Sequence, residues 1–214
     1  QIIYDDAFSG CGIISIVIPN SVTTLGEGAF SGCTNLTSVS LSNNLSTIPK
    51  TAFSGCESLT SVSIPKGVTT IGSSAFSNCT NLTSVSIPEG VTTIEAGAFA
   101  YCGFTTLTLP NSLQTIKDPE LSDYAGAFQG NYRLTKVVIP GNVTRIGGNA
   151  FSGCTSLTSV TIPKNVDNID MYVFDSCKSL ASIKVEYGNA MYDSRENCNA
   201  IILTSFNALI AGCV

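Results

Sequence analysis

Apolar and polar residues alternate along this chain in short runs that recur almost from end to end. In the stretch AFSNCTNLTSVSIPEGVTTIE, residues 75–95, apolar residues occupy the first, fourth and sixth positions of Leu82–Ile87. The Val-Ser-Ile end of this run alternates as a half-buried β-strand does. Pro88 closes the strand because proline cannot donate to a hydrogen-bonded ladder. Val91–Ile94 supplies a second inward-facing pair, and we expect Ala98–Phe99 to lie on a short helical or 3₁₀ turn.

The Ala-Phe dipeptide measures the period of this pattern. Each copy of the repeat is called a rung and begins at this dipeptide. The phenylalanines of rungs one to eight are Phe8, Phe30, Phe53, Phe76, Phe99, Phe128, Phe151 and Phe174, the last preceded by Val173. Successive spacings are 22, 23, 23, 23, 29, 23 and 23 residues, and a fixed period in this range indicates a solenoid. One rung buries too little apolar surface to offset the entropy of ordering it, so we expect the rungs to fold only when stacked.

Departures from the period set the expected domain organisation. Rung six begins late, which places an insertion at 117–124; its acidic and tyrosine content suits either a contact site or a tolerated surface loop. The period fails after rung eight, so we expect a solenoid over 1–185. Residues 186–214 should form an irregular segment and a β-hairpin, either a cap or the start of a further repeat block. Either Ile2–Ile3 forms a partial first rung, or the natural chain extends further upstream. We favour the second interpretation.

The repeat pattern LxxVxIPxxVTxIgxxAFxxCxxL, from about Ala7 to Ile183, resembles the BspA-like (Treponema-type) leucine-rich repeats of bacterial surface and secreted proteins. The tract Tyr192–Ile202 also looks like a segment common in members from gut Bacteroidetes. The resemblance implies an α/β repeat fold, a right-handed solenoid of about eight rungs with its parallel strands on the concave face. It also implies an extracellular or cell-surface location and adhesion to a protein partner, such as a host matrix or surface protein.

One cysteine recurs three residues after the phenylalanine of most rungs. This column consists of Cys11, Cys33, Cys56, Cys79, Cys102, Cys154 and Cys177, and Asn131 takes its place in rung six. A disulfide framework or metal array would need convergent cysteines, but these lie about one rung apart. Cysteine and asparagine share a donor that can reach a backbone carbonyl. We therefore interpret the column, Asn131 included, as a structural ladder of buried reduced thiols, with zinc or redox chemistry as the alternative.

Hydroxyl side chains fill the outward strand positions of five rungs. They are Thr37, Ser38, Ser40, Thr60, Ser61, Ser63, Thr83, Ser84, Ser86, Thr105, Thr106, Thr108, Thr158, Ser159 and Thr161. These rows suit a repetitive ligand such as a glycan, an extended protein or ice. Equally, threonine favours strands and repeat duplication copies whatever was present. A glycan platform would normally add aromatic rings, and these rows contain none.

Rungs six and eight break the hydroxyl pattern with Lys136, Val138 and Lys184, so this end of the surface is expected to carry more specificity. The candidate binding residues are therefore Thr83, Ser84, Ser86, Thr105, Thr106, Thr108, Lys136, Val138, Thr158, Ser159, Thr161 and Lys184. They should lie on one exposed face of the stacked strands, since every second residue of a strand points the same way.

The last two cysteines lie outside the column. Cys198 and Cys213 flank two apolar runs around 204–207, which predicts a β-hairpin. If its turn centres between Ser205 and Phe206, the numbers of opposed residues sum to 411, and Cys198 opposes Cys213. Facing cysteines in a non-hydrogen-bonded pair lie close enough for a disulfide, so the pair forms either a disulfide or two thiols.

Composition narrows the function classes. Charged residues make up 12% of the chain, the net charge is −5, and lysine and arginine form no cluster, which argues against nucleic acid as a partner. No apolar run is long enough for a membrane span. The chain has no histidine, which excludes a Ser-His-Asp triad and histidine zinc sites. We expect a binding protein without catalytic residues, cofactor or metal, with a protein partner or a glycan as its ligand, or a structural spacer within a longer surface protein.

Overall fold

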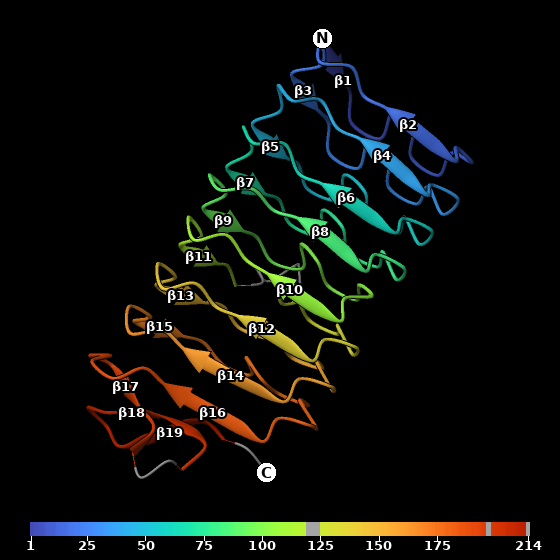
Figure 1. The fold of residues 1–214 in the computed structure, drawn as a ribbon. Coiled ribbons are helices and arrows are strands. Elements are labelled where there is room, and N and C mark those ends of the chain that lie inside the picture. The colour runs from blue at the N-terminus through green and yellow to red at the C-terminus, as the bar shows by residue number, and fades with distance from the viewer. Residues whose placement is uncertain (119–124, 196–197, 213–214) are drawn as a thin grey trace.

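The computed structural model describes residues 1–118, 125–195 and 198–212 as a coil of short parallel strands in two columns (Figure 1). The first column contains β2 (Ser15–Val17), β4 (Ser38–Ser40), β6 (Ser61–Ser63), β8 (Ser84–Ser86), β10 (Thr106–Thr108), β12 (Lys136–Val138), β14 (Ser159–Ile162) and β16 (Ser182–Val185). The second contains β1 (Ile2–Ile3), β3 (Thr24–Leu25), β5 (Thr47–Ile48), β7 (Thr70–Ile71), β9 (Thr93–Ile94), β11 (Thr115–Ile116), β13 (Arg145–Ile146) and β15 (Asn168–Ile169). The predicted solenoid of about eight turns is confirmed.

Pairing follows the repeat, because each strand lies beside its counterpart one rung away. Ser61 pairs with Ser84, and Thr106 with Lys136, so equivalent side chains form rows across the sheet. The second column forms a six-stranded sheet from β5 to β15, with β1 paired to β3. The first column divides into the hydrogen-bonded groups β2–β4, β6–β8 and β10–β12–β14–β16.

The core is a stack of phenyl rings that runs the length of the coil. Ring centroids of the eight rung phenylalanines lie 5.0–5.9 Å apart, with interplanar angles of 1–12°. Each ring from Phe30 to Phe174 is buried, together with the strand Leu, Val and Ile residues. The stack explains why the period tolerates little variation at phenylalanine: a smaller side chain would leave a gap between two neighbouring rings.

The expected α/β class is wrong for the part of the chain described, which contains strands and turns but no α-helix. The Ala-Phe segment forms turns and no helix because only every second N–H bonds locally along the chain: those of Ala52 and Ser54 donate three residues back, as in a 3₁₀ turn. Phe53 N–H donates to Ala75 O of the next rung at 2.8 Å, where a helix would need a partner four residues earlier. Left-handed residues on both sides, Thr51 at φ 52° and Gly55 at φ 71°, also stop helical propagation. The right-handed sense of the coil and the concave position of the strands stay predictions.

The two ends of the coil differ. At the N-terminus Ile2 pairs with Thr24, so Ile2–Ile3 forms a partial rung; the upstream extension that we favour from the sequence stays a prediction. At the other end β17 (Tyr192–Asp193), β18 (Ala200–Leu203) and β19 (Ala208–Gly212) form an antiparallel sheet that contacts β16 (Figure 1). The predicted hairpin is therefore present.

Two sequence predictions lie partly outside the described residues. Of the insertion at 117–124, only Lys117 and Asp118 are described. In the hairpin, Leu203 pairs with Ala208 and Ile202 with Leu209, in the predicted register, but an irregularity next to Ile201 shifts it by one residue. No helix among the described residues is long and apolar enough to cross a membrane.

Candidate binding surface

The outward side chains of the first column form one exposed face. All the predicted binding residues lie there and are exposed: Thr83, Ser84, Ser86, Thr105, Thr106, Thr108, Lys136, Val138, Thr158, Ser159, Thr161 and Lys184. Adjacent strands of a sheet lie roughly 4.8 Å apart, so equivalent residues repeat at that interval along the coil. The sequence therefore gives the solenoid an ordered polar surface three residues wide.

The three rows of this face differ in how their hydroxyls are used. The first row consists of the residue just before each strand. In this row the hydroxyls of Thr37, Thr83, Thr135 and Thr158 each donate to a backbone carbonyl of the preceding rung at 3.0–3.4 Å. Hydroxyls of the other two rows, such as Ser84 and Ser86, make no hydrogen bond to another described residue. The first row thus helps to hold the rungs together, and the second and third rows face solvent with their donors and acceptors available.

Rung six gives this polar face a groove and an apolar side chain. Val138 is 61% exposed, a large value for valine. A groove of about 310 Å³ lies between β12 and β14, and Lys136, Val138, Thr161 and Glu186 line it. Only Lys136 and Ser159 are paired between these two strands, so the strands leave room at their C-terminal ends.

A second and larger groove was not anticipated from the sequence. It has a volume of about 610 Å³ and lies where the ladder between β4 and β6 lapses, lined by Ser40, Asn43, Ser63 and Lys66 among others. The sequence signal was the loss of the strand-closing proline in rung two, where Ser42 stands instead. Ser42 Oγ donates to Val22 O at 2.6 Å, which ties this turn to the preceding rung.

The cysteine column lies inside the coil, beside the phenyl stack. Each Sγ from Cys33 onward lies 3.0–3.4 Å from the carbonyl oxygen of the phenylalanine in the preceding rung. Burial raises the pKa of Cys56 to about 12 and that of Cys177 to about 11. At neutral pH these groups are therefore thiols, able to donate a hydrogen bond and poor nucleophiles.

Asn131 occupies the column in rung six and makes two hydrogen bonds. Its Nδ2 donates to Phe99 O at 2.9 Å and to Phe128 O at 2.7 Å. The Phe99 and Phe128 rings are 5.9 Å apart, close to the 5.8 Å between Phe151 and Phe174, where Cys177 Sγ lies 3.2 Å from Phe151 O, so a thiol can also span a step of this width. Its Oδ1 is buried without a partner.

Thiol labelling of the folded chain should separate the cysteines by burial. We expect Cys198, which is exposed, to react with Ellman's reagent within minutes, and the buried Cys33, Cys56, Cys79, Cys102 and Cys154 to react only at the rate of unfolding. The measurement is mass spectrometry of peptides after timed labelling. A matched Cys198→Ser chain should lose a fast-reacting site, and rapid labelling of Cys102 would contradict the interpretation. Cys213 lies outside the described residues, so the alternative of a Cys198–Cys213 disulfide stays a prediction; if it forms, Cys198 will not react either, and peptide mapping without reductant tests it.

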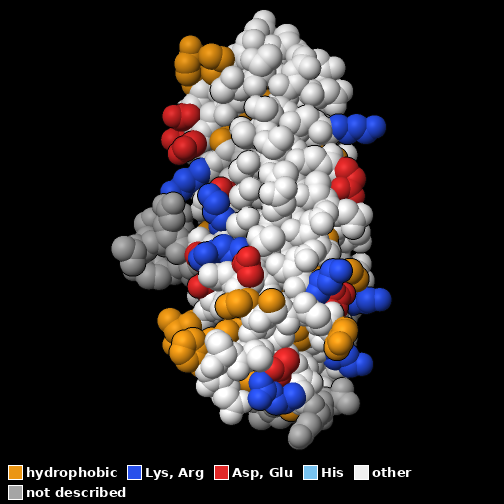
Figure 2. Space-filling model, turned by 90° about the vertical axis from the view of Figure 1, so that its left-hand side faces the viewer, with side chains coloured by type: hydrophobic (Ala, Val, Ile, Leu, Met, Phe, Trp, Pro, Cys, Tyr) orange, Lys and Arg blue, Asp and Glu red, His pale blue; other side chains and the backbone are white. Residues whose placement is uncertain are grey.

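The second column carries charge along the margins of its face and mainly uncharged side chains at the centre (Figure 2). One cluster joins three rungs. Arg145 Nη2 forms an ion pair with Asp118 and another, at 2.9 Å, with Asp170. Asp118 Oδ1 accepts from Gly148 N–H at 2.8 Å. This cluster was not anticipated from the sequence, since its members are about one rung apart. No group of metal-binding side chains is found among the residues described.

The titrations of the two carboxyls of this cluster are coupled. Burial, followed by the hydrogen bond and charge of Asp118, raises the pKa of Asp170 to about 6. Burial alone would raise the pKa of Asp118 too, but hydrogen bonds from Asp170, Gly148 and Arg145 outweigh it and lower that pKa. Because the two carboxylates repel each other when both are ionised, the pair takes up one shared proton as pH falls through about 6.

Replacing Asp170 should change how stability depends on pH. Because the pKa of Asp170 is higher in the folded chain than its ordinary 3.8, its contribution is complete below pH 4 and is lost as pH rises through about 6. We expect the wild type to lose stability between pH 4 and pH 6.5 relative to Asp170→Asn, as measured by urea denaturation at a series of pH values. Asp167→Asn, next to the cluster, is the control. Parallel profiles for wild type and Asp170→Asn would contradict the shared proton.

The C-terminal segment closes the last rung through side-chain hydroxyls. Tyr192 Oη accepts from Ile169 N–H of β15 at 2.9 Å, and Ser194 Oγ accepts from Val185 N–H of β16 at 2.9 Å. In earlier rungs the matching donors bond the next rung; Ile64 N–H, for example, donates to Ser86 O. Tyr192 and Ser194 therefore supply acceptors to both strand columns at the end of the coil.

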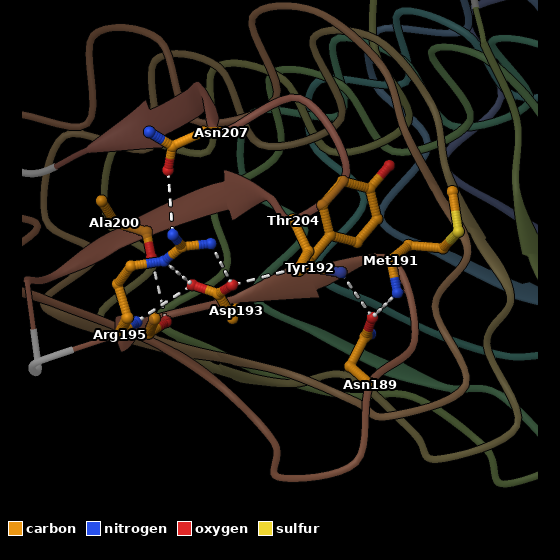
Figure 3. A network of polar contacts seen from close by, with 9 residues as sticks. Asn189, Met191, Tyr192, Asp193, Arg195, Ala200, Thr204 and Asn207 are labelled. Carbon is orange, nitrogen blue, oxygen red and sulfur yellow. Dashed lines mark hydrogen bonds and ion pairs between the residues drawn. The ribbon is translucent and has the colours of Figure 1, made fainter.

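A polar network stiffens this closing segment (Figure 3). Arg195 bonds both carboxylate oxygens of Asp193, at 2.8 and 2.6 Å, and Asn207 Oδ1 at 2.9 Å. Thr204 Oγ1 also donates to Asp193. Hydrogen bonds from Arg195, together with Thr204, lower the pKa of Asp193 to about 2. Asn189 Oδ1 accepts from the N–H groups of Met191 and Tyr192, which fixes the turn into β17.

Comparison with known proteins agrees with this architecture. The family model of the BspA type leucine rich repeat region matches the chain in six copies, over residues 1–125 and 120–208. Among solved structures, the T. pallidum leucine rich repeat protein TpLRR is 31% identical with a TM-score of 0.64, over 73% of this chain and 71% of that one. A leucine-rich repeat protein from Bacteroides ovatus is 26% identical with a TM-score of 0.60, over 86% of this chain and 58% of that one.

A leucine-rich repeat protein from Eubacterium ventriosum is also similar, with 26% identity and a TM-score of 0.51, over 83% of this chain and 56% of that one. The chain thus spans less than two thirds of the length of the Bacteroides and Eubacterium proteins. No curated protein sequence matches it.

Proposed function

Because the chain belongs to the BspA-type leucine-rich-repeat family, we propose that it is a non-enzymatic scaffold that binds a partner protein through the exposed face of its first strand column. Leucine-rich-repeat proteins usually mediate protein interactions. We place its action outside the cell or at a bacterial cell surface, as an adhesin whose partner is a host matrix or surface protein. The location and the partner rest on the family resemblance.

Rung six carries the proposal. Lys136 and Val138 replace hydroxyl residues there, and the groove of about 310 Å³ beside them offers a recess to a partner side chain. Lys184 adds a second positive charge to the same face in rung eight. Interfaces gain most of their energy from a few side chains that are desolvated on binding, and an exposed valine beside a recess is better suited to this than a row of serines.

The hydroxyl rows favour a second candidate, a module that binds a glycan or another repetitive surface. Their second and third rows make no hydrogen bonds to other described residues and repeat in register from rung to rung. A repetitive ligand could contact many rungs weakly, and such contacts add through multivalency. The remaining candidate, a spacer within a longer surface protein, would use neither rung six nor the rows.

We also propose structural roles for the cysteine column with Asn131 and for the C-terminal segment 186–214. We assign the cysteine column with Asn131 to satisfying phenylalanine carbonyls inside the coil, supported by the Sγ–O distances above. We assign residues 1–185 to the solenoid and 186–214 to a closing cap, supported by the acceptors that Tyr192 and Ser194 supply to the last strands. The absence of histidine leaves a protein of this family few means of acid–base catalysis at neutral pH.

The test is a screen of the purified chain against host matrix proteins and a glycan array at two salt concentrations. If a protein binds, Lys136→Glu with Lys184→Glu should weaken it about tenfold or more, and Thr83→Val with Thr106→Val should have little effect. Lys66→Glu, outside rungs six to eight, controls for the change of charge. A glycan hit that only the threonine variants weaken would favour the second candidate, and no hit at all would favour the spacer.

A further inference from the structure

Two tyrosines and an arginine stand exposed on the turns that lead into β10 and β12, at the right-hand edge of the coil in Figure 1. Tyr101 is 41% exposed and Tyr132 is 50% exposed. The guanidinium carbon of Arg133 lies 5.5 Å from the centroid of the Tyr132 ring, within the range of a cation–π contact. Other rungs place small or polar residues at the Tyr132 position, such as Thr34 and Thr155.

Tyr101 occupies a backbone position that suits glycine. Its φ is 58°, and rungs one, two, three, six and seven place glycine at the equivalent position. A non-glycine residue in the left-handed region costs of order 1–3 kcal/mol, and such residues cluster at functional sites. Here the ring packs over Gly130 of the next rung, where an added Cβ would overlap it. Asn78 and Ser176 occupy the equivalent position in rungs four and eight at φ 59° and 56°, so the turn also accepts other side chains; at Tyr101 it holds an aromatic ring at the surface beside rung six.

This edge leads along the chain to the rung-six groove. Along the chain, Tyr132 and Arg133 lead directly to Lys136 and Val138, all exposed. The equivalent turn residues in rungs five and seven carry no acidic side chain. The acidic residue at the groove is Glu186, and its Oε2 already accepts from Lys164 N–H at 3.0 Å. A positive, aromatic strip therefore stands on a chain whose net charge is −5, and the groove at one end of it has both apolar (Val138, Ile139) and polar (Lys136, Glu186) lining.

We propose that Tyr101, Tyr132, Arg133 and Lys136 with the adjoining groove bind an acidic peptide segment of a partner protein that also carries an apolar or aromatic side chain. Carboxylates would pair with Arg133 and Lys136, the tyrosines would offer flat contact area, and the apolar side chain would enter the groove beside Val138. Tyrosine and arginine are the residues most enriched at interface hot spots. A peptide fits better than an anionic glycan, because a sugar has no side chain to fill an apolar recess. The proposal rests on the binding function above and names its partner.

The test uses a fluorescein-labelled random copolymer of glutamate and tyrosine, with fluorescence anisotropy of the full chain as the readout. We expect wild type to bind it and to bind polyglutamate more weakly. Tyr101→Gly and Tyr132→Thr should each weaken binding at least about fivefold, and Arg133→Glu more. Tyr101→Gly should melt at the same or a higher temperature than wild type, because glycine suits its φ, so its loss of binding would not reflect unfolding. Thr80→Ala, on the same edge in rung four, should bind as wild type does.

Three outcomes would overturn the proposal. One is that the copolymer does not bind to wild type. Another is that it binds equally to both tyrosine variants; if Lys136→Glu still weakens a protein partner in the screen above, the binding function stands and only this strip is excluded. The third is that hyaluronan, an anionic glycan, binds and the copolymer does not, with the same losses in the tyrosine variants, which would assign the strip to acidic sugars.

Discussion

Phe99→Ala should remove about 3–5 kcal/mol from the free energy of unfolding, the usual cost of deleting a buried phenyl group. Phe99 is fully buried near the middle of the ring stack. Its centroid lies 5.4 Å from that of Phe76 and 5.9 Å from those of Phe128 and Phe104, the last in an edge-on arrangement. Rung spacing is fixed by the strand hydrogen bonds on both sides, so the coil cannot collapse to fill the gap.

A matched variant at the end of the stack makes this expectation specific. Phe8 is only partly buried and stacks on a single ring, that of Phe30, so Phe8→Ala should cost clearly less than Phe99→Ala. Urea denaturation followed by far-UV circular dichroism suits the measurement, because the chain has no tryptophan. Since solenoid rungs contact only their neighbours, Phe99→Ala should also broaden the transition as the two halves uncouple. Equal losses for the two variants would show that the stack does not carry the core.

The overall coil was predictable because its information is local and repeated. The alternation in Leu82–Ile87 and the closing Pro88 recur in most rungs, so strands, period and number of turns could be read directly, and the structure confirms them. The Ala-Phe segment was predictable only in part: its 3₁₀-type bonds are local, but Phe53 N–H bonds Ala75 of the next rung, which keeps the turn from continuing as a helix. A contact between rungs leaves no trace in the short-range pattern of one rung.

For the candidate surface, too, the sequence predicts which residues are exposed but not the contacts between rungs. Which strand positions face outward follows from alternation, and the structure finds Lys136 and Val138 exposed as that pattern requires. The groove beside them depends on how far two strands separate, and the strip at Tyr101 depends on the contact of its ring with Gly130. The pairing of Arg145 with Asp118 and Asp170 likewise needs rungs five to seven stacked in register. Residue types could be read from the sequence, but these distances could not.

Asn131 offers the most direct test of the ladder inside the coil. Asn131→Leu has a similar volume but no donor, so Phe99 O and Phe128 O would each lose a hydrogen bond from its Nδ2. A buried polar group left without a partner costs about 1–3 kcal/mol. Phe128 O keeps a hydrogen bond from Cys154 Sγ at 3.4 Å, so only Phe99 O loses its side-chain partner, and we expect a loss of about 1–3 kcal/mol, measured by urea denaturation.

Asn131→Cys is the informative partner of this variant, because it restores the residue of the other rungs. It keeps a donor near Phe99 O and removes the buried Oδ1 that has no partner. Against these gains, the single thiol donor would replace two hydrogen bonds from Asn131 Nδ2; the width of the step is no obstacle, since Cys177 spans a similar one. We therefore expect Asn131→Cys to lie within about 1 kcal/mol of wild type, the net value of a single hydrogen bond, and far above Asn131→Leu. If the two variants are equally destabilised, the column serves to fill space, and its donors do not matter to the fold.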